Sequence, residues 1–294
     1  MTPPVGILLV DKPSGPTSHD VVEQVRKAAG IRRVGHAGTL DPFASGLLLL
    51  LLGSATRLSE YFLGMETGYD ATLRLGMETD SWDLEGEVIR EDPGWNRITG
   101  EDVEMALAGL RGPILQTPPV YSAKKIRGEA AHRRARRGED VSLDPVEVTV
   151  LDLTLAGVEL PFVHLKVHCS SGTYVRALAR DLGRALGVGG HLTALRRTSI
   201  GPFAVSEALA PSSLGDPASV LEALIPSAPA LAHLPAVVVG PEQAARIRQG
   251  QSLPLVENGL PEEAPVRILL EGELVAVAYG EGGRLRPRKV MSHG

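Results

Sequence analysis

Short apolar runs separated by glycine- and proline-rich turns fill the start of the chain. Residues 6–13, GILLVDKP, form an apolar run that Lys-Pro stops, which predicts a strand. Residues 20–30, DVVEQVRKAAG, place valine and alanine at helical spacing, so we expect a helix that Ser18 or Asp20 caps. The consecutive leucines Leu47–Leu52 predict another buried segment.

The centre of the chain switches between the strand and the helix period. Residues 69–89 alternate apolar and polar positions on both sides of a turn-rich middle, as paired strands do. Residues 99–112 predict a capped helix, and residues 146–170 predict two strands joined by a turn. Residues 171–187, SGTYVRALARDLGRALG, return to a helical period behind a turn of small residues.

The composition changes again towards the C-terminal end. Residues 211–235 are rich in Pro, Ser and Ala and predict a connecting segment with one short helix. Residues 236–294 predict a compact, β-rich module with its own turns. We therefore expect an α+β main domain over residues 1–210, the connecting segment, and a small C-terminal domain.

Composition narrows the class of protein. Of 294 residues, 43% are hydrophobic and 22% are charged, which is typical of a globular rather than a disordered chain. The leucine run is too short for a membrane span, which needs about 20 apolar residues, and the N-terminal residues do not resemble a signal peptide. The single cysteine, Cys169, excludes an internal disulfide and suits a reducing cytoplasm. Zinc-type Cys/His spacing, HExxH and Walker A sequences are absent.

Charge is unevenly distributed along the chain. The formal net charge of −5 argues against a nucleic-acid partner only if charge is spread evenly. Residues 124–138, KKIRGEAAHRRARRG, instead gather seven cations against one acid, Glu129. This clustering favours an element that contacts the phosphates of a nucleic acid, and a solvated surface helix is the alternative. The expected phosphate-contacting residues are Lys124, Lys125, Arg127, Arg133, Arg134, Arg136 and Arg137.

A glycine-rich loop, residues 35–46 with the sequence GHAGTLDPFASG, holds one carboxylate, Asp41. Proline after Asp41 restricts its backbone to an extended conformation. A lone loop aspartate is often a turn or cap residue, and a carboxylate would repel phosphate. Held against an apolar run, however, Asp41 is also a candidate nucleophile or base. Arg176, near the start of the helix predicted after residue 171, is a candidate partner for a carboxylate or a phosphate.

Six blocks of the chain, in order, resemble the signature sequences of the TruB family of tRNA pseudouridine synthases. They extend from residue 6 to about residue 203, and the C-terminal residues resemble the PUA-type domain of that family. The blocks are GILLVDKPSGPTSHD, GHAGTLDPFASG, YDATLRLGMETDSWDLEG, PPVYSAKKIRGEAAHRRARRG, HCSSGTYVRALARDLG and HLTALRRTSIGPF.

The resemblance implies a catalytic domain built on a mixed, mainly antiparallel sheet with flanking helices, followed by a PUA-like RNA-binding domain. It implies an isomerase that flips uridine 55 out of the tRNA T-loop and converts it to pseudouridine without a metal or an organic cofactor. The expected partner is the T-stem-loop of tRNA, which residues 121–140 would clamp. A cytoplasmic monomer that needs no protein partner and no membrane is expected, and assistance to tRNA folding is compatible with such an enzyme.

The resemblance also assigns roles to single residues. Asp41 falls on the catalytic aspartate and is expected to be the nucleophile. Attack on the sugar C1′ and attack on the uracil ring are both left open as alternatives. Tyr69 falls on the active-site tyrosine, and Arg176 falls on the arginine that pairs with the aspartate. The substrate-binding positions are His36, Tyr174, Leu195 and Lys12.

Two other functions compete with this interpretation. A guide-RNA-dependent relative would share the aspartate motif, but the long insertion at residues 121–140 favours a stand-alone enzyme. An RNA chaperone without turnover would use the same cleft, but it would not need Asp41, Tyr69 and Arg176.

Overall fold

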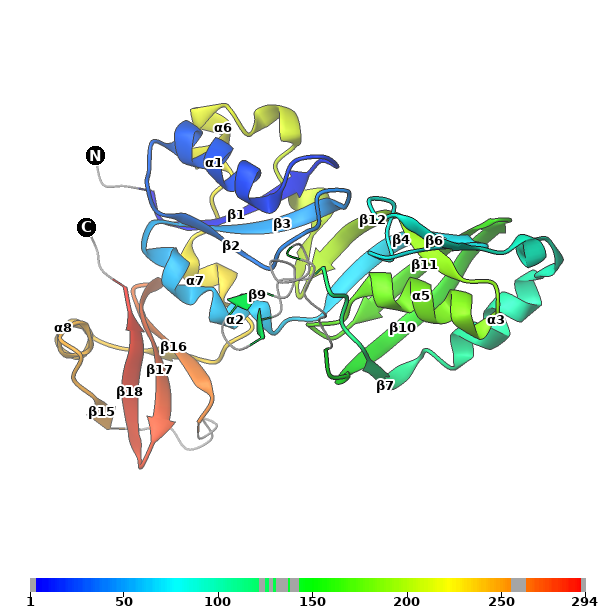
Figure 1. Cartoon of the computed structure of the whole chain (residues 1–294). Helices are drawn as coiled ribbons and strands as arrows, with labels where there is room; N and C mark the ends of the chain where they lie inside the picture. Colours follow the sequence, from blue (N-terminus) through cyan, green and yellow to red (C-terminus); the bar gives the residue numbers. More distant parts are fainter. Residues whose placement is uncertain are drawn as a thin grey trace.

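The computed structural model describes residues 4–121, 125–126, 129–130, 137, 143–254 and 263–291. These residues build one large sheet with helices packed on it and a smaller sheet at the C-terminal end (Figure 1). The large sheet has nine strands in the order β1-β3-β12-β4-β11-β10-β7, with β2 paired to β3 and β13 paired to β12. All its pairings are antiparallel except that of β3 with β12, which confirms the mixed, mainly antiparallel sheet. The strands are β1 Gly6–Lys12, β2 Val34–Ala37, β3 Ser45–Leu52, β4 Thr67–Leu75, β7 Gly112–Gln116, β10 Val146–Glu159, β11 Phe162–Cys169, β12 Gly190–Ile200 and β13 Phe203–Ala204.

The leucine run forms strand β3, which is buried on both faces. Successive side chains of a strand point to opposite faces. The even-numbered leucines of Leu47–Leu52 therefore pack into one hydrophobic core, and the odd-numbered leucines pack into a second core on the other face. β1 occupies one edge of β3, while β12 and β2 share the other edge.

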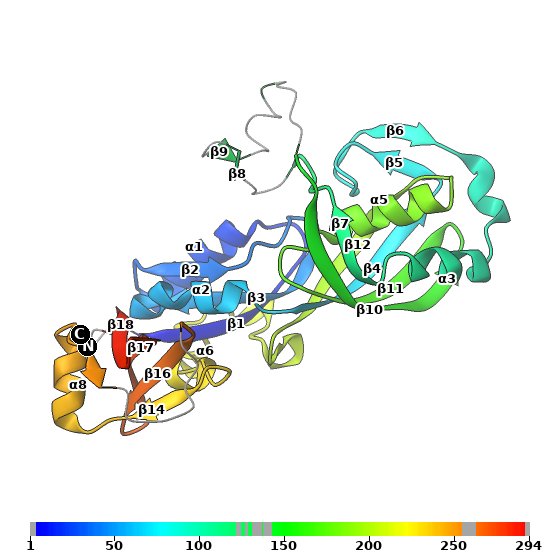
Figure 2. The ribbon, with the colours of Figure 1, turned by 90° about the horizontal axis from the view of Figure 1, so that it is seen from below.

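The other half of the sheet carries two helices on one face (Figures 1 and 2). Helix α5, Val175–Ala185, packs on β4 and β12, and helix α3, Gly100–Ala108, packs on β10 beside it. The strand residues beneath α5 are apolar, whereas the alternate residues of β4 face away and are partly exposed. This is the pattern of an antiparallel sheet with one covered face.

Helix α1, Ser18–Ala29, is capped by the residue before Ser18, the first of its two expected caps. Thr17 is the N-cap: its hydroxyl accepts a hydrogen bond from the Asp20 amide, and the Asp20 carboxylate accepts one from the Thr17 amide. This reciprocal capping box replaces the predicted capping by Ser18 or Asp20. Ser18 is buried, and its hydroxyl is directed to a different loop.

Residues 69–89 do form strands, but the expected pairing across their turn is wrong for the longer strand. β4 pairs with β11 and β12, which begin 95 and 123 residues after β4 begins. Only the short strands β5, Met77–Thr79, and β6, Val88–Glu91, pair with each other. The alternation of β4 identifies a strand but not its neighbours, because any half-buried strand shows the same period.

The segment after residue 210 packs closely on the large sheet. It contains two short helices, α6 Pro217–Glu222 and α7 Ser227–Ala230, where one was expected. Ile225 and Ile7 exchange two backbone hydrogen bonds of 2.8 Å. The segment thus covers part of β1, which would otherwise be an exposed sheet edge.

The C-terminal residues form a five-stranded sheet in the order β14-β16-β17-β18-β15, with helix α8, Pro241–Arg248, packed on it. This module contacts the rest of the chain near helix α2, Glu60–Leu63. The Arg57 guanidinium donates to the Val290 carbonyl (2.7 Å), and Lys289 pairs with Glu60 (2.8 Å). The strands are β14 Ala236–Val238, β15 Leu253–Pro254, β16 Pro265–Leu270, β17 Glu273–Glu281 and β18 Arg284–Val290.

Short elements complete the described chain. Strands β8, Lys125–Ile126, and β9, Glu129–Ala130, pair with each other. The 3-10 segments are Gly53–Leu58, Pro93–Arg97, Val205–Glu207 and Pro211–Ser213. Within the described ranges, no helix combines the length and the apolar content that a membrane crossing requires.

Candidate active site

The loop that carries Asp41 lies where β3 changes its partner in the large sheet. β12 pairs with the start of β3, and β2 pairs with its end. Residues 38–44 connect β2 back to β3 at this junction, so they lie beside β12 and above the start of β3. The glycine at position 46 permits the close approach, since its φ of 100° falls in the left-handed region.

Residues from the N-terminal end hold one side of this loop. The Ser18 hydroxyl donates to the Leu40 carbonyl (3.0 Å) and accepts from the Leu40 amide (2.9 Å). The Lys12 amine donates to the Pro42 carbonyl (3.2 Å), and the Ser14 hydroxyl donates to the carbonyl of Phe43 (2.8 Å). The backbone on both sides of Asp41 is therefore fixed by side chains from β1, from α1 and from the turn between them.

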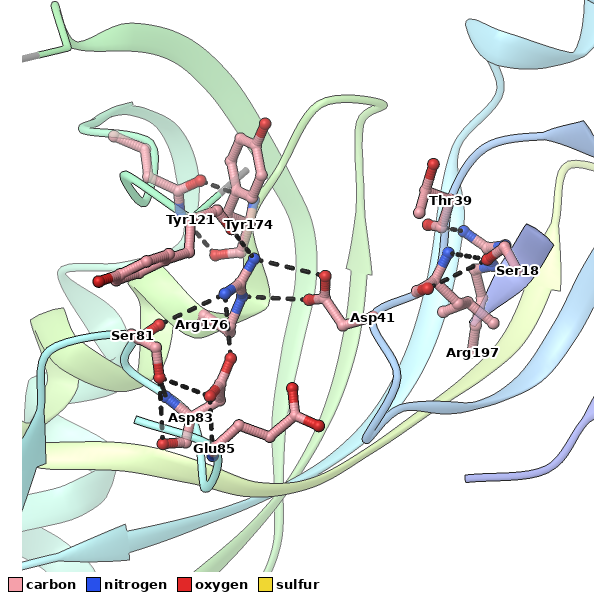
Figure 3. Close-up of polar contacts among 12 residues, drawn as sticks. Ser18, Thr39, Asp41, Ser81, Asp83, Glu85, Tyr121, Tyr174, Arg176 and Arg197 are labelled. Carbon is pink, nitrogen blue, oxygen red and sulfur yellow. Dashed lines mark hydrogen bonds and ion pairs between the residues drawn. The ribbon is translucent and has the colours of Figure 1, made fainter. Parts of the chain in front are cut away.

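Arg197 of β12 holds the other side of the loop. Its Nε donates to the Leu47 carbonyl (2.7 Å), and its two terminal nitrogens donate to the carbonyls of Gly38 (3.2 Å) and Thr39 (3.4 Å). Figure 3 shows this cluster next to Asp41, with Ser18 and Thr39 drawn beside Arg197. Arg197 was not among the expected site residues.

Arg176, in the first turn of α5, lies between two carboxylates (Figure 3). Its Nε is 3.1 Å from Asp41 Oδ2, and its Nη2 is 3.5 Å from Asp41 Oδ1. Its Nη1 is 3.0 Å from Asp83 Oδ2, and Nη2 also donates to the Tyr121 carbonyl (2.9 Å). The expected pairing of Arg176 with Asp41 is thus present in the geometry, together with a second acid that the sequence did not single out.

Asp83 is placed by a turn between β5 and β6. Its carboxylate accepts from the Ser81 hydroxyl (2.5 Å) and the Glu85 amide (3.0 Å). The ring of Trp82 lies against the Arg180 guanidinium of α5, 4.0 Å from the ring centroid. The turn is therefore anchored to the same helix that carries Arg176.

A fully buried glutamine fixes the start of α5. The Gln116 side chain donates to the Tyr174 carbonyl (3.1 Å) and accepts from the Tyr174 amide (2.7 Å). Tyr174 is the N-cap of α5 and has no capping hydrogen bond of its own side chain. Gln116 thus satisfies the backbone where the helix begins and helps to set the direction of Arg176.

These elements enclose a cavity of about 310 Å³. Five of the seven expected catalytic and substrate-binding residues line it: Asp41, Tyr69, Tyr174, Arg176 and Leu195. Arg197 and the apolar side chains of Phe62, Leu63, Met65 and Ile200 also contribute to the wall. The volume is near the lower limit of small-molecule sites, which is about 300–1,000 Å³. A cavity of this size suits a single nucleoside better than a nucleic-acid double helix.

The other expected residues lie elsewhere. Lys12 is 0% exposed and lies beneath the loop, so it does not offer its amine to the cavity surface. His36 is half-buried on β2, directly before the cavity-lining residues. Lys125 belongs to β8 and Arg137 is exposed, whereas the remaining basic residues of the clamp lie outside the described ranges: Lys124, Arg127, Arg133, Arg134 and Arg136.

The surroundings of Asp41 act on its pKa in opposite directions. Burial raises the pKa, Arg176 lowers it, Asp83 raises it, and Lys12 and Arg197 lower it. The side chain is nevertheless 35% exposed towards the cavity. Asp41 is therefore a partly desolvated carboxylate with an open approach, which is what a nucleophile or base requires.

The described residues include no group of three or more His, Cys, Asp or Glu side chains arranged to hold a metal ion. Asp41 and Asp83 share Arg176, whose single positive charge compensates one of the two carboxylates.

Comparison with known proteins identifies the family. Residues 26–175 match the N-terminal domain of the TruB family pseudouridylate synthases. Residues 176–222 match the tRNA pseudouridylate synthase B C-terminal domain, and residues 235–291 match the C-terminal domain of pseudouridine synthase II TruB. The chain belongs to the TruB family.

Curated relatives match the TruB-family chain over nearly its whole length. The tRNA pseudouridine synthase B of Thermobifida fusca (strain YX) is 45% identical, covering 98% of this chain and 98% of its own length. That of Aromatoleum aromaticum is 44% identical, covering 98% of this chain and 92% of its own length.

Solved structures show the same fold. An H/ACA RNP bound to a substrate RNA containing 2′-deoxyuridine includes a chain that matches with a TM-score of 0.74 at 25% identity, covering 98% of this chain and 85% of that chain. A Cbf5-Nop10-Gar1 complex matches with a TM-score of 0.74 at 27% identity, covering 97% and 84% of the two chains. The fold of this TruB-family chain is therefore that of a pseudouridine synthase with a β-rich C-terminal part.

Proposed function

We propose that the protein isomerises uridine 55 in the T-loop of tRNA to pseudouridine, with Asp41 as the nucleophile. The observation that carries this proposal is a carboxylate that is paired with a buried arginine and still 35% exposed to a nucleoside-sized cavity. Membership of the TruB family and relatives named tRNA pseudouridine synthase B support tRNA as the substrate. Substrate and product have the same atoms, so the reaction itself consumes no second reactant.

The chemistry needs a nucleophile and a fixed base. The bond between the sugar C1′ and the uracil nitrogen breaks, and a bond from C1′ to a ring carbon forms after the base rotates. Asp41 attacks either C1′ or the uracil ring, and both routes need an ionised, oriented carboxylate. Arg176 supplies the orientation through its two contacts to Asp41. Tyr69 and Leu195, which line the cavity, are placed to contact the base, with Tyr69 as its cap and as a proton acceptor.

The recessed site implies that the target nucleotide leaves its stack. A base inside a folded T-loop cannot reach Asp41 while it is stacked, and flipping it out costs a few kcal/mol. His36 lies directly before the cavity-lining residues and is the candidate side chain to occupy the vacated position. Tyr174, at the cavity wall, contacts the extruded nucleotide in this proposal.

RNA binding outside the cavity is assigned to two parts of the chain. The basic residues between 124 and 137 contact the phosphate backbone of the T-stem-loop. Residues 236–294 act as a PUA-like domain that adds contacts elsewhere on the tRNA, joined by residues 211–235 to a catalytic domain over residues 1–210.

The test is to incubate the purified protein alone with an unmodified tRNA transcript and to map pseudouridine by position. We expect a single product at uridine 55, and no product with Asp41→Asn or with a transcript that carries cytidine at that position. Asp152→Asn is the matched control, because this carboxylate lies on β10 outside the cavity lining and should leave turnover unchanged. Full activity of Asp41→Asn would contradict the assignment of the nucleophile.

The same assay separates the stand-alone enzyme from a guide-RNA-dependent one. Chains from the H/ACA RNP and Cbf5-Nop10-Gar1 structures are 25% and 27% identical to this chain, whereas curated relatives named tRNA pseudouridine synthase B reach 48%. Product formed without any other RNA or protein supports the stand-alone reaction, and a strict requirement for either would refute it.

A further inference from the structure

Arg197 is a buried cation that the expected chemistry does not use. It is 4% exposed, although arginine is almost never buried without a partner. Its side chain lines the cavity, and on the neighbouring strand β4 its backbone partner is Tyr69. Arg197 therefore faces the same space as Asp41.

The contrast with the preceding residue shows how unusual this burial is. Arg196 points to the opposite face of β12 and forms a bidentate ion pair with Asp11, at 2.9 and 2.8 Å. For Arg197, no carboxylate of the described residues lies within ion-pair distance, and its three hydrogen bonds all go to neutral carbonyls. A buried charge without an ion-pair partner is costly, so stability alone is a poor explanation for it.

The three carbonyls belong to the loop that carries Asp41 and to the strand behind it. Gly38 and Thr39 lie on the N-terminal side of Asp41, and Leu47 lies in β3. The guanidinium reaches them because β12 and β3 approach closely: a Cβ atom on Gly46 would be 2.2 Å from the Arg197 carbonyl oxygen. One rigid, planar group thus links three points around the loop.

We propose that Arg197 is a positioning residue for the reaction, whose guanidinium fixes the loop around Asp41 and adds its positive charge to those near that carboxylate. Arg176 pairs with Asp41 directly, whereas Arg197 acts through the backbone and through its field. This inference rests on the proposed function, because it assigns Arg197 a part in the reaction of Asp41.

The charge of Arg197 acts among several groups that face Asp41. The cations are Arg176 from α5 and Lys12 from β1, and the acids are Asp83 and Glu85 from the turn after β5. Removing one cation from this balanced set raises the pKa of Asp41, because Arg197 lowers it in the intact protein. The pKa of His36, which burial and then Arg197 lower, also rises.

The experiment compares Arg197→Met, Arg197→Lys and the neighbouring control Arg196→Met. Turnover at saturating tRNA is measured across pH, tRNA binding is measured separately, and thermal unfolding gives the folded fraction. For Arg197→Met we expect kcat per folded molecule to fall at least about tenfold, tRNA affinity to stay within about threefold, and the acid limb of kcat to move to higher pH. Arg197→Lys retains the charge, so its acid limb should stay near that of the wild type while kcat falls because the three-point contact is lost.

Arg196→Met breaks an ion pair on the same strand and should change neither kcat nor the acid limb. The proposal is overturned if Arg197→Met and Arg196→Met have the same kcat and acid limb. It is also overturned if both Arg197 variants fail to fold, because Arg197 would then serve folding alone. An inactive wild type would instead refute the proposed function, so the two failures can be told apart.

Discussion

Lys12 provides a quantitative test of how the loop around Asp41 is supported. Its amine is completely buried and donates to the carbonyls of Pro13 (2.9 Å), Pro16 (2.7 Å) and Pro42 (3.2 Å). Burial lowers the pKa of Lys12 from 10.5 to about 8, although Asp41 and other carboxylates oppose the change. The folded protein therefore holds this proton less tightly than the unfolded chain does. Between pH 8 and 10.5 the unfolded chain binds more protons, so the contribution of Lys12 to stability rises with pH.

The size of the effect follows from the two pKa values. Integrating proton binding from pH 7 to pH 9.5, with 8 for the folded state and 10.5 for the unfolded state, gives a gain of about 2 kcal/mol in the free energy of unfolding. In Lys12→Met this group is absent, while every other titrating group remains. The difference in stability between wild type and Lys12→Met should therefore change by about 2 kcal/mol in favour of the wild type over this pH range.

The assay is urea unfolding of both proteins at pH 7, 8.5 and 9.5 at constant ionic strength, with free energies extrapolated to water. Taking the difference between the two proteins at each pH cancels the titration of all shared groups. A difference that stays constant within about 0.5 kcal/mol would refute the reasoning, because Lys12 would then titrate alike in the folded and unfolded states.

Four further predictions concern the site and its supports. Asp83→Asn should lower kcat about tenfold or more, because Arg176 loses its buried ion-pair partner. The same substitution should move the acid limb of the kcat–pH profile to lower pH, because Asp83 raises the pKa of Asp41. Asp41→Asn should raise the melting temperature at neutral pH, because burial raises the pKa of Asp41 and its charge therefore opposes folding. Below pH 3.8 the substitution should not raise the melting temperature. An equal or lower melting temperature at neutral pH would contradict this reasoning. Gly46→Ala should cost at least about 3 kcal/mol in urea unfolding, whereas Gly250→Ala, at a φ of 80° with open space around it, should cost only about 1 kcal/mol. Weaker tRNA binding with a shallower salt dependence is expected when four cations are neutralised together: Arg133, Arg134, Arg136 and Arg137.

Periodicity and resemblance together could predict most of the frame and the centre of the site. The alternating runs at residues 146–170 became β10 and β11, and the helical period after residue 171 became α5. These elements bury one face each, which leaves a local signal in the sequence. Asp41 alone had no such signal, and only the ordered blocks around it made it a candidate.

The supporting residues could not be predicted, because their roles depend on contacts between distant parts of the chain. Asp83 lies 93 residues before Arg176, and Arg197 lies 159 residues after Gly38. Asp83 sits in a polar turn, and Arg197 follows another arginine, so each matches a solvent-exposed residue in its local pattern. Ser18 was weighed only as a helix cap, since nothing near it in the sequence indicates the Leu40 backbone. Such roles are decided by packing, which a single sequence does not display.

The leucine strand β3 has a consequence for where Asp41 can lie. In most half-buried strands, a slip of one residue exposes apolar side chains, and this penalty fixes the register. In β3 a slip exchanges one leucine for another in both cores, so side-chain burial does not distinguish the alternatives. The ends of the strand fix it instead: a Cβ on Gly46 would be 2.2 Å from the Arg197 carbonyl oxygen, and one on Gly53 would be 2.8 Å from the Pro4 carbonyl oxygen.

The close backbone contacts of the two glycines therefore fix the distance along the chain between the two ends of the leucine run. A chain with one leucine fewer would leave one core a single leucine short, and it could not place both glycines at their close contacts. One end of the strand would move by about 3.3 Å, the rise of one residue. If that end were Gly46, the loop with Asp41 would move with it. The number of leucines, rather than their hydrophobicity, thus encodes the position of the candidate nucleophile.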